Sequence, residues 1–287
     1  MPTTSHKQIL NDTDMPLRLH ALVCQDHSID NGMEVARPAI HPGDLRRNNI
    51  LASLSESEID FLLPHLEMCD LPFNRSLYQY GDTLSHVYFP TTAIVSMIYV
   101  LADGGMTEIS VVGHEGLLGV SVLTGENALG TAVVRSAGEA YKVKASVLQE
   151  LYLRGGSLPQ LLLRYSQLLF VQATQNSVSA RHYSIDQQLS RWLLEHLDRL
   201  PGNVLKVTQE FIANMLGVRR ESVTEASGKL QSEGLIQNKR GNIIVLDREG
   251  LETYAGECYN VAKREMDQML SLAQYRGAAL ATVQVSI

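Results

Sequence analysis

Cysteine is scarce in this 287-residue chain, and long apolar stretches are missing. The three cysteines, Cys24, Cys69 and Cys258, lie far apart, which excludes a disulfide framework and a zinc knuckle. The longest uncharged run, residues 87–102, is too short to span a bilayer and contains Pro90. The N-terminal residues show no basic segment followed by an apolar core. We therefore expect a cytoplasmic protein without a membrane partner.

Catalytic motifs are missing as well. The chain has no G-x-S-x-G, no phosphate-binding loop and no H-E-x-x-H. A jelly-roll enzyme would need histidine and carboxylate ligands clustered at short spacing, and His86, His114 and Glu115 do not form such a set. We expect neither a metal site nor an enzyme.

An overall basic charge is also lacking. The formal net charge is −7, which at first argues against a nucleic-acid partner. Between Leu205 and Arg248, however, seven basic side chains stand against five acidic ones, a balance of +2 that leaves −9 for the rest. This segment is therefore the part of the chain suited to DNA phosphates. Because the excess is small, affinity requires two copies of it or close contacts.

What the chain does have is a series of short apolar runs separated by glycine turns. From residue 71 to 143 this alternation favours a β sandwich or roll. The turn 103–105 between residues 93–101 and 106–112 predicts a hairpin. Ser55 and Glu58 are spaced as a capping box that opens a helix. Residues 1–45 lack sustained periodicity and are interpreted as a poorly ordered extension, with a short helix as an option near residues 17–23.

A long helix is predicted from residue 158 to about residue 182. Its apolar seam alternates steps of four and three residues, which favours a two-stranded coiled coil and a homodimer over a helix packed on its own domain. The seam turns polar after Leu169, so the helix pair is a candidate switch element. The predicted dimer seam consists of Leu158, Leu162, Tyr165, Leu169, Gln172 and Asn176.

Residues 208–224, TQEFIANMLGVRRESVT, predict two short helices joined by a turn at Gly217. Ser184 and Gln187 form a capping box for a preceding helix, residues 185–200. Arginine can bind guanine bidentately in the major groove, and glutamate can accept a hydrogen bond from cytosine, so the outward face of the second helix suits base reading. The predicted base-reading residues are Arg219, Arg220, Glu221, Thr224 and Glu225.

A β hairpin with a basic tip is expected next. Gly234 ends the second helix, and two short apolar runs, residues 235–236 and 243–246, flank a turn at 239–242. Such a hairpin is typical of a wing beside a helix-turn-helix. The predicted phosphate contacts are Lys206, Thr208, Ser222, Lys239 and Arg240. A last helix is expected from Leu251 to about residue 272.

This order of parts resembles the Crp/Fnr family of transcription regulators, related to the cyclic-AMP receptor protein, over residues 46–260. The resemblance is carried by GDTLSHVYFPTTAIVSMI (81–98), VGHEGLLG (112–119), RWLLEHLDRL (191–200), the helix-turn-helix and GLIQNKRGNIIVLD (234–247), and it points to a subgroup without an assigned effector. It implies an α+β fold: an N-terminal cyclic-nucleotide-binding-like β roll, a long dimerisation helix and a C-terminal winged helix-turn-helix. The expected divisions are an extension (1–45), a sensor roll (46–156), the dimerisation helix (157–183), the DNA-binding domain (184–248) and a C-terminal helix and tail (249–287).

The resemblance also implies roles for single residues. In the cyclic-AMP receptor protein an Arg-Glu pair and a later Arg read bases; Arg220 and Glu221 match the pair, and Glu225 stands at the later Arg. The mode of docking therefore carries over, whereas the operator sequence does not. A carboxylate at this position would disfavour guanine and favour cytosine.

The effector pocket of the family uses a Gly-Glu turn and a downstream phosphate-binding arginine. The candidates here are Glu115, Gly116, Gly130 and Thr131, and the arginine is absent. Cyclic AMP is therefore not expected as the effector. Three cysteines exclude a four-cysteine iron–sulfur cluster within one chain, haem binding through His86 or His114 has no support, and no cofactor is assigned.

The expected function is that of a homodimeric regulator that binds a palindromic operator through the major groove. Its expected partners are double-stranded DNA and a second copy of itself, with RNA polymerase as a further candidate. The alternatives are a non-catalytic ligand-binding or scaffold protein with a β roll and, last, a jelly-roll enzyme. DNA affinity that is flat with salt would favour the scaffold.

Overall fold

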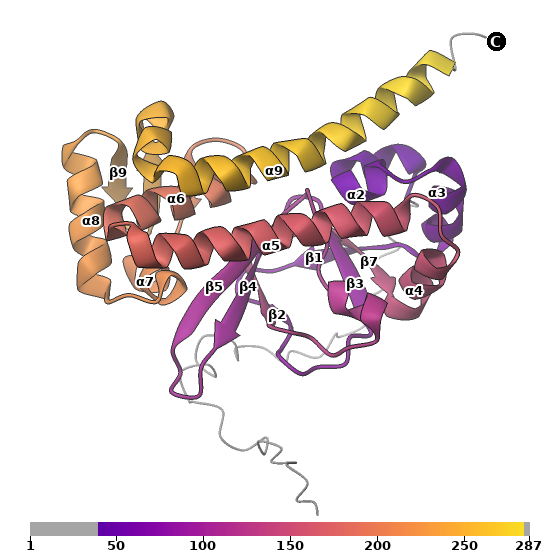
Figure 1. Cartoon of the computed structure of the whole chain (residues 1–287), viewed down its shortest axis with the longest axis horizontal. Helices are drawn as coiled ribbons and strands as arrows, with labels where there is room; N and C mark the ends of the chain where they lie inside the picture. The colour runs from indigo at the N-terminus through magenta and orange to yellow at the C-terminus, as the bar shows by residue number, and fades with distance from the viewer. Residues whose placement is uncertain (1–39, 284–287) are drawn as a thin grey trace, which may run out of the picture.

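A computed structural model describes residues 40–283, with side chains up to residue 271. Figure 1 shows two long helices, α5 and α9, running beside each other above the β strands. Helices α2 and α3 lie near the start of α5, and α7, α8 and β9 gather at the other end of the molecule. The expected α+β class is confirmed. The short helix considered near residues 17–23 lies outside the described residues.

The β roll consists of two antiparallel sheets, with strand orders β1-β7-β3 and β2-β6-β4-β5. The predicted hairpin is confirmed, because β4 and β5 pair from Val95↔Val112 to Val100↔Met106. Gly104 in its turn has φ 85°, a conformation that glycine adopts without strain. The strands are β1 (Glu67–Leu71), β2 (Ser76–Tyr78), β3 (His86–Pro90), β4 (Ile94–Val100), β5 (Met106–Val112), β6 (Thr131–Ser136) and β7 (Gly138–Lys144).

The helices around the roll are joined by one buried carboxylate, that of Glu58. The predicted capping box is confirmed, since Glu58 accepts a hydrogen bond from the Ser55 amide at 2.8 Å. Glu58 also accepts from the amides of Ser157 (2.8 Å) and Leu158 (2.9 Å), and so caps α5. The helical segments are η1 (Pro42–Arg47), α2 (Asn49–Ala52), α3 (Glu56–Leu62), η2 (Leu63–His65), η3 (Val120–Thr124), α4 (Ala145–Leu153) and α5 (Leu158–His182).

The second half of the chain begins with α6, whose predicted capping box is confirmed and which ends three residues earlier than expected. A strand that the sequence did not suggest, β8, joins the wing to make a sheet of order β8-β10-β9. The last helix starts earlier and runs further than expected and is kinked at Gly256 (φ 70°, ψ −154°). The elements are α6 (Ile185–Leu197), β8 (Val204–Lys206), α7 (Gln209–Leu216), α8 (Arg220–Ser232), β9 (Ile236–Lys239), β10 (Asn242–Val245) and α9 (Arg248–Val283).

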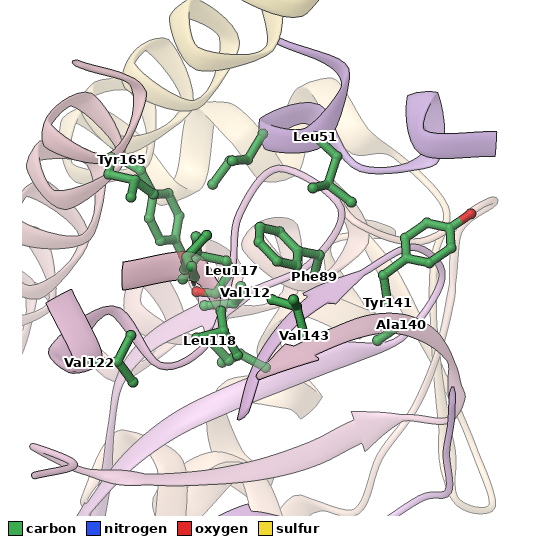
Figure 2. Packing of buried hydrophobic residues seen from close by; sticks show 14 of the residues in the cluster. Leu51, Phe89, Val112, Leu117, Leu118, Val122, Ala140, Tyr141, Val143 and Tyr165 are labelled. Atoms are coloured by element: carbon green, nitrogen blue, oxygen red, sulfur yellow. Dashed lines mark hydrogen bonds between the residues drawn. The ribbon is translucent and has the colours of Figure 1, made fainter. Parts of the chain in front are cut away.

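Two hydrophobic cores meet at the four-stranded sheet. In the first, Figure 2 shows Phe89 and Val143 of the roll near Leu117, toward which Tyr165 reaches from α5. The Tyr165 hydroxyl donates to the Leu117 carbonyl at 2.8 Å. The second core, built on α6, α7 and α8, includes Ile98 and Val133 of the sheet. The roll therefore packs directly on the helix-turn-helix half of the chain.

The structure corrects the predicted dimer seam on α5. Leu158, Leu162, Tyr165 and Gln172 are at most 4% exposed within a single chain, and Leu169 packs on the same core. The Gln172 side chain accepts from the Val111 amide at 3.1 Å, and Asn176 donates to the Ile109 carbonyl at 2.8 Å. A 3.5-residue repeat identifies a buried helix face but not the surface that buries it. Here the chain's own sheet and helix α9 cover that face.

Candidate DNA-binding surface

The helix-turn-helix is built as the sequence predicts. The Thr208 hydroxyl caps α7 by accepting from the Phe211 amide at 3.2 Å. Gly217 then reverses the chain in the left-handed conformation (φ 68°, ψ 31°). Inward-facing Ile212 and Val223 are fully buried. Burial of one side of α8 leaves its opposite side turned outward, at the edge of the molecule in Figure 1.

All five residues predicted to read bases lie on this exposed side of α8 and the turn before it. The side chain of Thr224 also has a partner inside the protein, because its hydroxyl donates to Gln209 Oε1 at 2.8 Å and lies 3.0 Å from the Arg220 carbonyl. The exposed residues are Arg219, Arg220, Glu221, Thr224 and Glu225.

The residues predicted to contact phosphate gather on the wing and at the start of α7. In the wing sheet, Asn242 pairs with Lys206 on one side and with Lys239 on the other. Residues paired directly across strands share one face of a sheet, so the two lysines lie on the same face, two strand spacings or roughly 10 Å apart. Lys206, Thr208, Lys239 and Arg240 are exposed, and Ser222 is half-buried.

A hollow of about 460 Å³ separates the wing from the helix-turn-helix. Its lining includes Thr208, Gln209, Arg220, Lys239 and Arg240. The structure thus brings together one predicted base-reading residue and three predicted phosphate contacts from elements far apart in the sequence. The polar and basic lining suits an anionic backbone.

Two cations of the basic segment are not free to meet a ligand. Lys229 Nζ lies 2.5 Å from Asp186 Oδ2, and Arg248 is paired with Asp198 and Glu252. Burial opposes ionisation of Asp186, but hydrogen bonds led by that from Lys229 lower its pKa to about 2. Within the described residues, the cations that form no ion pair in this segment are Lys206, Arg219, Arg220, Lys239 and Arg240.

The residues predicted for the effector pocket make contacts within the protein. Glu115 is 1% exposed and accepts from Arg199 Nε at 2.7 Å and from the Gly113 amide at 3.1 Å. Gly116 is in close contact with α5, since a Cβ there would lie 2.3 Å from the Tyr165 ring. The other two candidates lie elsewhere: Gly130 packs under the Ile98 carbonyl, and Thr131 Oγ1 accepts from the Tyr80 amide at 3.3 Å. Glu115 is therefore the anchor of an internal ion pair.

A polar junction between the roll and α6–α7 was missed by sequence reasoning. Glu108 of β5 faces His196 of α6 at 3.5 Å and accepts a hydrogen bond from Ser96. Burial alone would raise the pKa of Glu108, but nearby His196 and the hydrogen bond from Ser96 hold the pKa below its ordinary value. The guanidinium of Arg135 lies 4.2 Å from the centre of the Phe211 ring in α7. These partners are far apart in the chain, so no local sequence pattern predicts their contacts.

Comparison with known proteins matches residues 187–254 to the Crp-like helix-turn-helix domain. No curated protein matches. A regulator from Eubacterium rectale assigned to the crp/fnr family has a similar fold, with a TM-score of 0.60, 17% identity and coverage of 74% of this chain and 99% of its own. FixK2 from Bradyrhizobium japonicum is similar with a TM-score of 0.59 and 17% identity, and the match covers 67% of this chain and 98% of FixK2. A CRP-family regulator from Thermus thermophilus is similar with a TM-score of 0.55 and 20% identity, and the match covers 67% of this chain and 97% of the regulator.

Among residues 40–283, no helix is both long and apolar enough to cross a bilayer. The side chains described in the structure form no cluster of three or more potential metal ligands. The helix-turn-helix match coincides with the elements whose geometry is given above, and the fold of the solved regulators includes the roll and the long helix. Residues 187–254 therefore match the Crp-like helix-turn-helix domain, and the chain shares its fold with solved regulators assigned to the Crp/Fnr family.

Proposed function

We propose that the protein is a homodimeric, sequence-specific DNA-binding regulator that reads a palindromic operator through the major groove. The observation that carries this proposal is the exposed side of α8, with Arg220 and Glu221, beside the basic wing tip at Lys239 and Arg240. A helix of this kind enters the major groove while flanking cations contact phosphates. RNA polymerase as a partner rests on the family resemblance alone.

Dimer formation is supported by the face of α5 that the chain leaves uncovered. Leu163 and Phe170 are each 73% exposed and stand seven residues apart, and Val178 follows at 38% exposed. Residues one heptad apart lie on the same side of a helix, so this face suits a second copy of α5. Two copies related by a two-fold axis would present two α8 helices to the two halves of a palindrome.

The dimer is tested by placing a charge on this face. We expect Leu163→Asp combined with Phe170→Asp to give a monomer in sedimentation velocity and to weaken operator binding. The matched control is Leu153→Asp, because Leu153 is 83% exposed but belongs to α4. A double variant that remains as dimeric as the control would contradict the use of this face.

The operator is identified by selecting bound sequences from random DNA with the purified protein. We expect a palindromic consensus whose half-sites lie about one helical turn, or 10 base pairs, apart. Cytosine opposite Glu225 is the expected consequence of a carboxylate in the groove. Failure to enrich any sequence, or binding that does not weaken as salt rises, would remove the proposal in favour of a scaffold protein.

We propose that cyclic AMP is not the effector. Glu115, the residue that would hold the ribose, already binds Arg199, and the phosphate-binding arginine is absent. Saturating cyclic AMP should therefore leave the melting temperature unchanged, since a ligand that binds the native state raises it. A clear rise would overturn this part of the proposal.

A further inference from the structure

The inner edge of α8 carries three polar side chains whose partners lie in the elements on either side of it. Thr224, Ser227 and Gln231 are spaced three and four residues apart and so follow one side of the helix. Thr224 donates to Gln209 Oε1 at the start of α7, at 2.8 Å. Ser227 and Gln231 both bind Asn238 in β9 of the wing. Helix α8 is thus hydrogen-bonded to α7 through Thr224 and to the wing through Ser227 and Gln231.

Asn238 makes the wing attachment with its side chain and its backbone. Its Oδ1 accepts from the Ser227 hydroxyl at 2.8 Å, its amide donates to Gln231 Oε1 at 2.8 Å, and its Nδ2 lies 3.4 Å from the Ser227 carbonyl. Strand β9 is an edge of the wing sheet, so its outward backbone groups need partners other than a strand. Ser227 is fully buried, which shields the contact from water.

Each attachment residue is the sequence neighbour of a predicted phosphate contact. Asn238 precedes Lys239 in the wing, and Gln209 follows Thr208 at the cap of α7. Both Gln209 and Asn238 line the hollow between the wing and the helix-turn-helix. These hydrogen bonds join the wing and α7 directly to α8, so they can fix where the neighbouring phosphate-binding groups stand relative to the bases that α8 reads.

We propose that Asn238 and Gln209 are positioning residues for sequence discrimination, an inference that rests on the proposed DNA-binding function. They hold the wing and α7 at fixed places on α8, so that phosphate contacts form only when the base-reading residues are in register. Without them, Lys239 and Arg240 can still bind phosphate but over a range of positions. Affinity for the operator then falls, whereas affinity for random DNA is retained.

The wing does not depend on Asn238 for its own packing. Ile236, Ile243 and Val245 are at most 4% exposed and hold the wing sheet on the core. Asn238→Ala should therefore fold, with a melting temperature close to that of the unaltered protein. Gln237→Ala is the matched control, because Gln237 is an exposed neighbour on the same strand.

The test measures affinity for the selected operator and for random DNA with the full chain. We expect Asn238→Ala to reduce the ratio of the two affinities about tenfold, the size of one good base contact, with Gln237→Ala unchanged. Asn238→Asp keeps the acceptor for Ser227 and adds a charge, so both affinities should fall while their ratio is kept. Gln209→Ala and Gln209→Glu should repeat this pattern on the α7 side.

The results separate the inference from the function on which it rests. If the unaltered protein does not distinguish operator from random DNA, the proposed function fails, and the inference fails with it. If the unaltered protein discriminates but Asn238→Ala and Gln209→Ala keep the same ratio, only the inference is overturned. A ratio lost equally in the alanine and the acidic variants would also contradict it, because the acceptor would then be irrelevant.

Discussion

Where the β roll meets α6, charged side chains are buried and paired, whereas the cations at the start of α8 and at the tip of the wing are exposed and form no ion pair with another described residue. Glu115 and Arg199 are 1% and 2% exposed at the side chain and lie 2.7 Å apart. Arg220 and Lys239, in contrast, are open to solvent beside a polar hollow. Taking a charge out of water is costly unless a partner replaces the water. The buried charges therefore hold the molecule together, and the exposed ones are available for a ligand.

The largest effect is expected from breaking the buried pair. Arg199→Ala leaves the Glu115 carboxylate buried without its cation, which should lower the free energy of unfolding by about 3–5 kcal/mol. The control is Arg154→Ala, since the Arg154–Glu150 pair is also within hydrogen-bonding distance but is more than half exposed, and such pairs contribute about 0–1 kcal/mol. Urea unfolding measures both. Equal effects of the two changes would contradict the distinction drawn between buried and exposed charges.

A smaller and pH-dependent effect is expected at Glu58, which caps α5. Burial opposes its ionisation, but hydrogen bonds from Ser157, Ser55 and Leu158 lower its pKa from 4.5 to about 2. A lowered carboxyl pKa stabilises the native state above the ordinary pKa, and this stabilisation is lost as the pH falls toward 2. Glu58→Gln should therefore cost about 1–3 kcal/mol near neutral pH.

Unfolding of this variant and of the unaltered chain across pH 2–7 checks the sign. The difference between their unfolding free energies should be full above about pH 4.5 and should shrink as the pH falls. A difference that grows toward acid would show that Glu58 does not act as an ionised cap.

The smallest effect is expected from a free cation of the wing. Lys239→Ala should weaken binding to every DNA sequence alike and reduce the slope of log affinity against log salt by about 1. Lys229→Ala is the informative comparison. Because Lys229 is already paired with Asp186, this substitution should leave the slope of log affinity against log salt unchanged. Fluorescence titration at several salt concentrations measures both. If Lys229→Ala changes the slope as much as Lys239→Ala, the separation into free and paired cations is wrong.

Local features of the sequence predicted the turns and helix starts on which the candidate site is built. The turn at Gly217 requires a left-handed residue, the end of α8 has Gly234, and the capping boxes at Ser55 and Ser184 start helices where expected. Each of these signals depends on residues within a few positions of one another, so one sequence is enough to recognise it.

Features that depend on distant partners could not be predicted in the same way. The repeat along α5 identified a buried face, but not that the chain's own sheet and α9 bury it, because periodicity carries no information about the partner. Glu115 was predicted as a pocket residue because Glu115 and Gly116 resemble the Gly-Glu turn of the family, whereas its partner Arg199 lies 84 residues away. Asp186 likewise lies outside residues 205–248, whose charges were summed above, and it neutralises Lys229 within that segment.

The central claim, that α8 reads base sequence, is tested most directly by Arg220→Ala. Affinities for the selected operator, for operators with single base changes and for random DNA are compared at one salt concentration. We predict a loss of about 1–3 kcal/mol on the operator, a smaller loss on random DNA and relaxed preference at one base pair of each half-site. Equal losses on operator and random DNA, or no loss on either, would contradict the assignment of α8 as the reading helix.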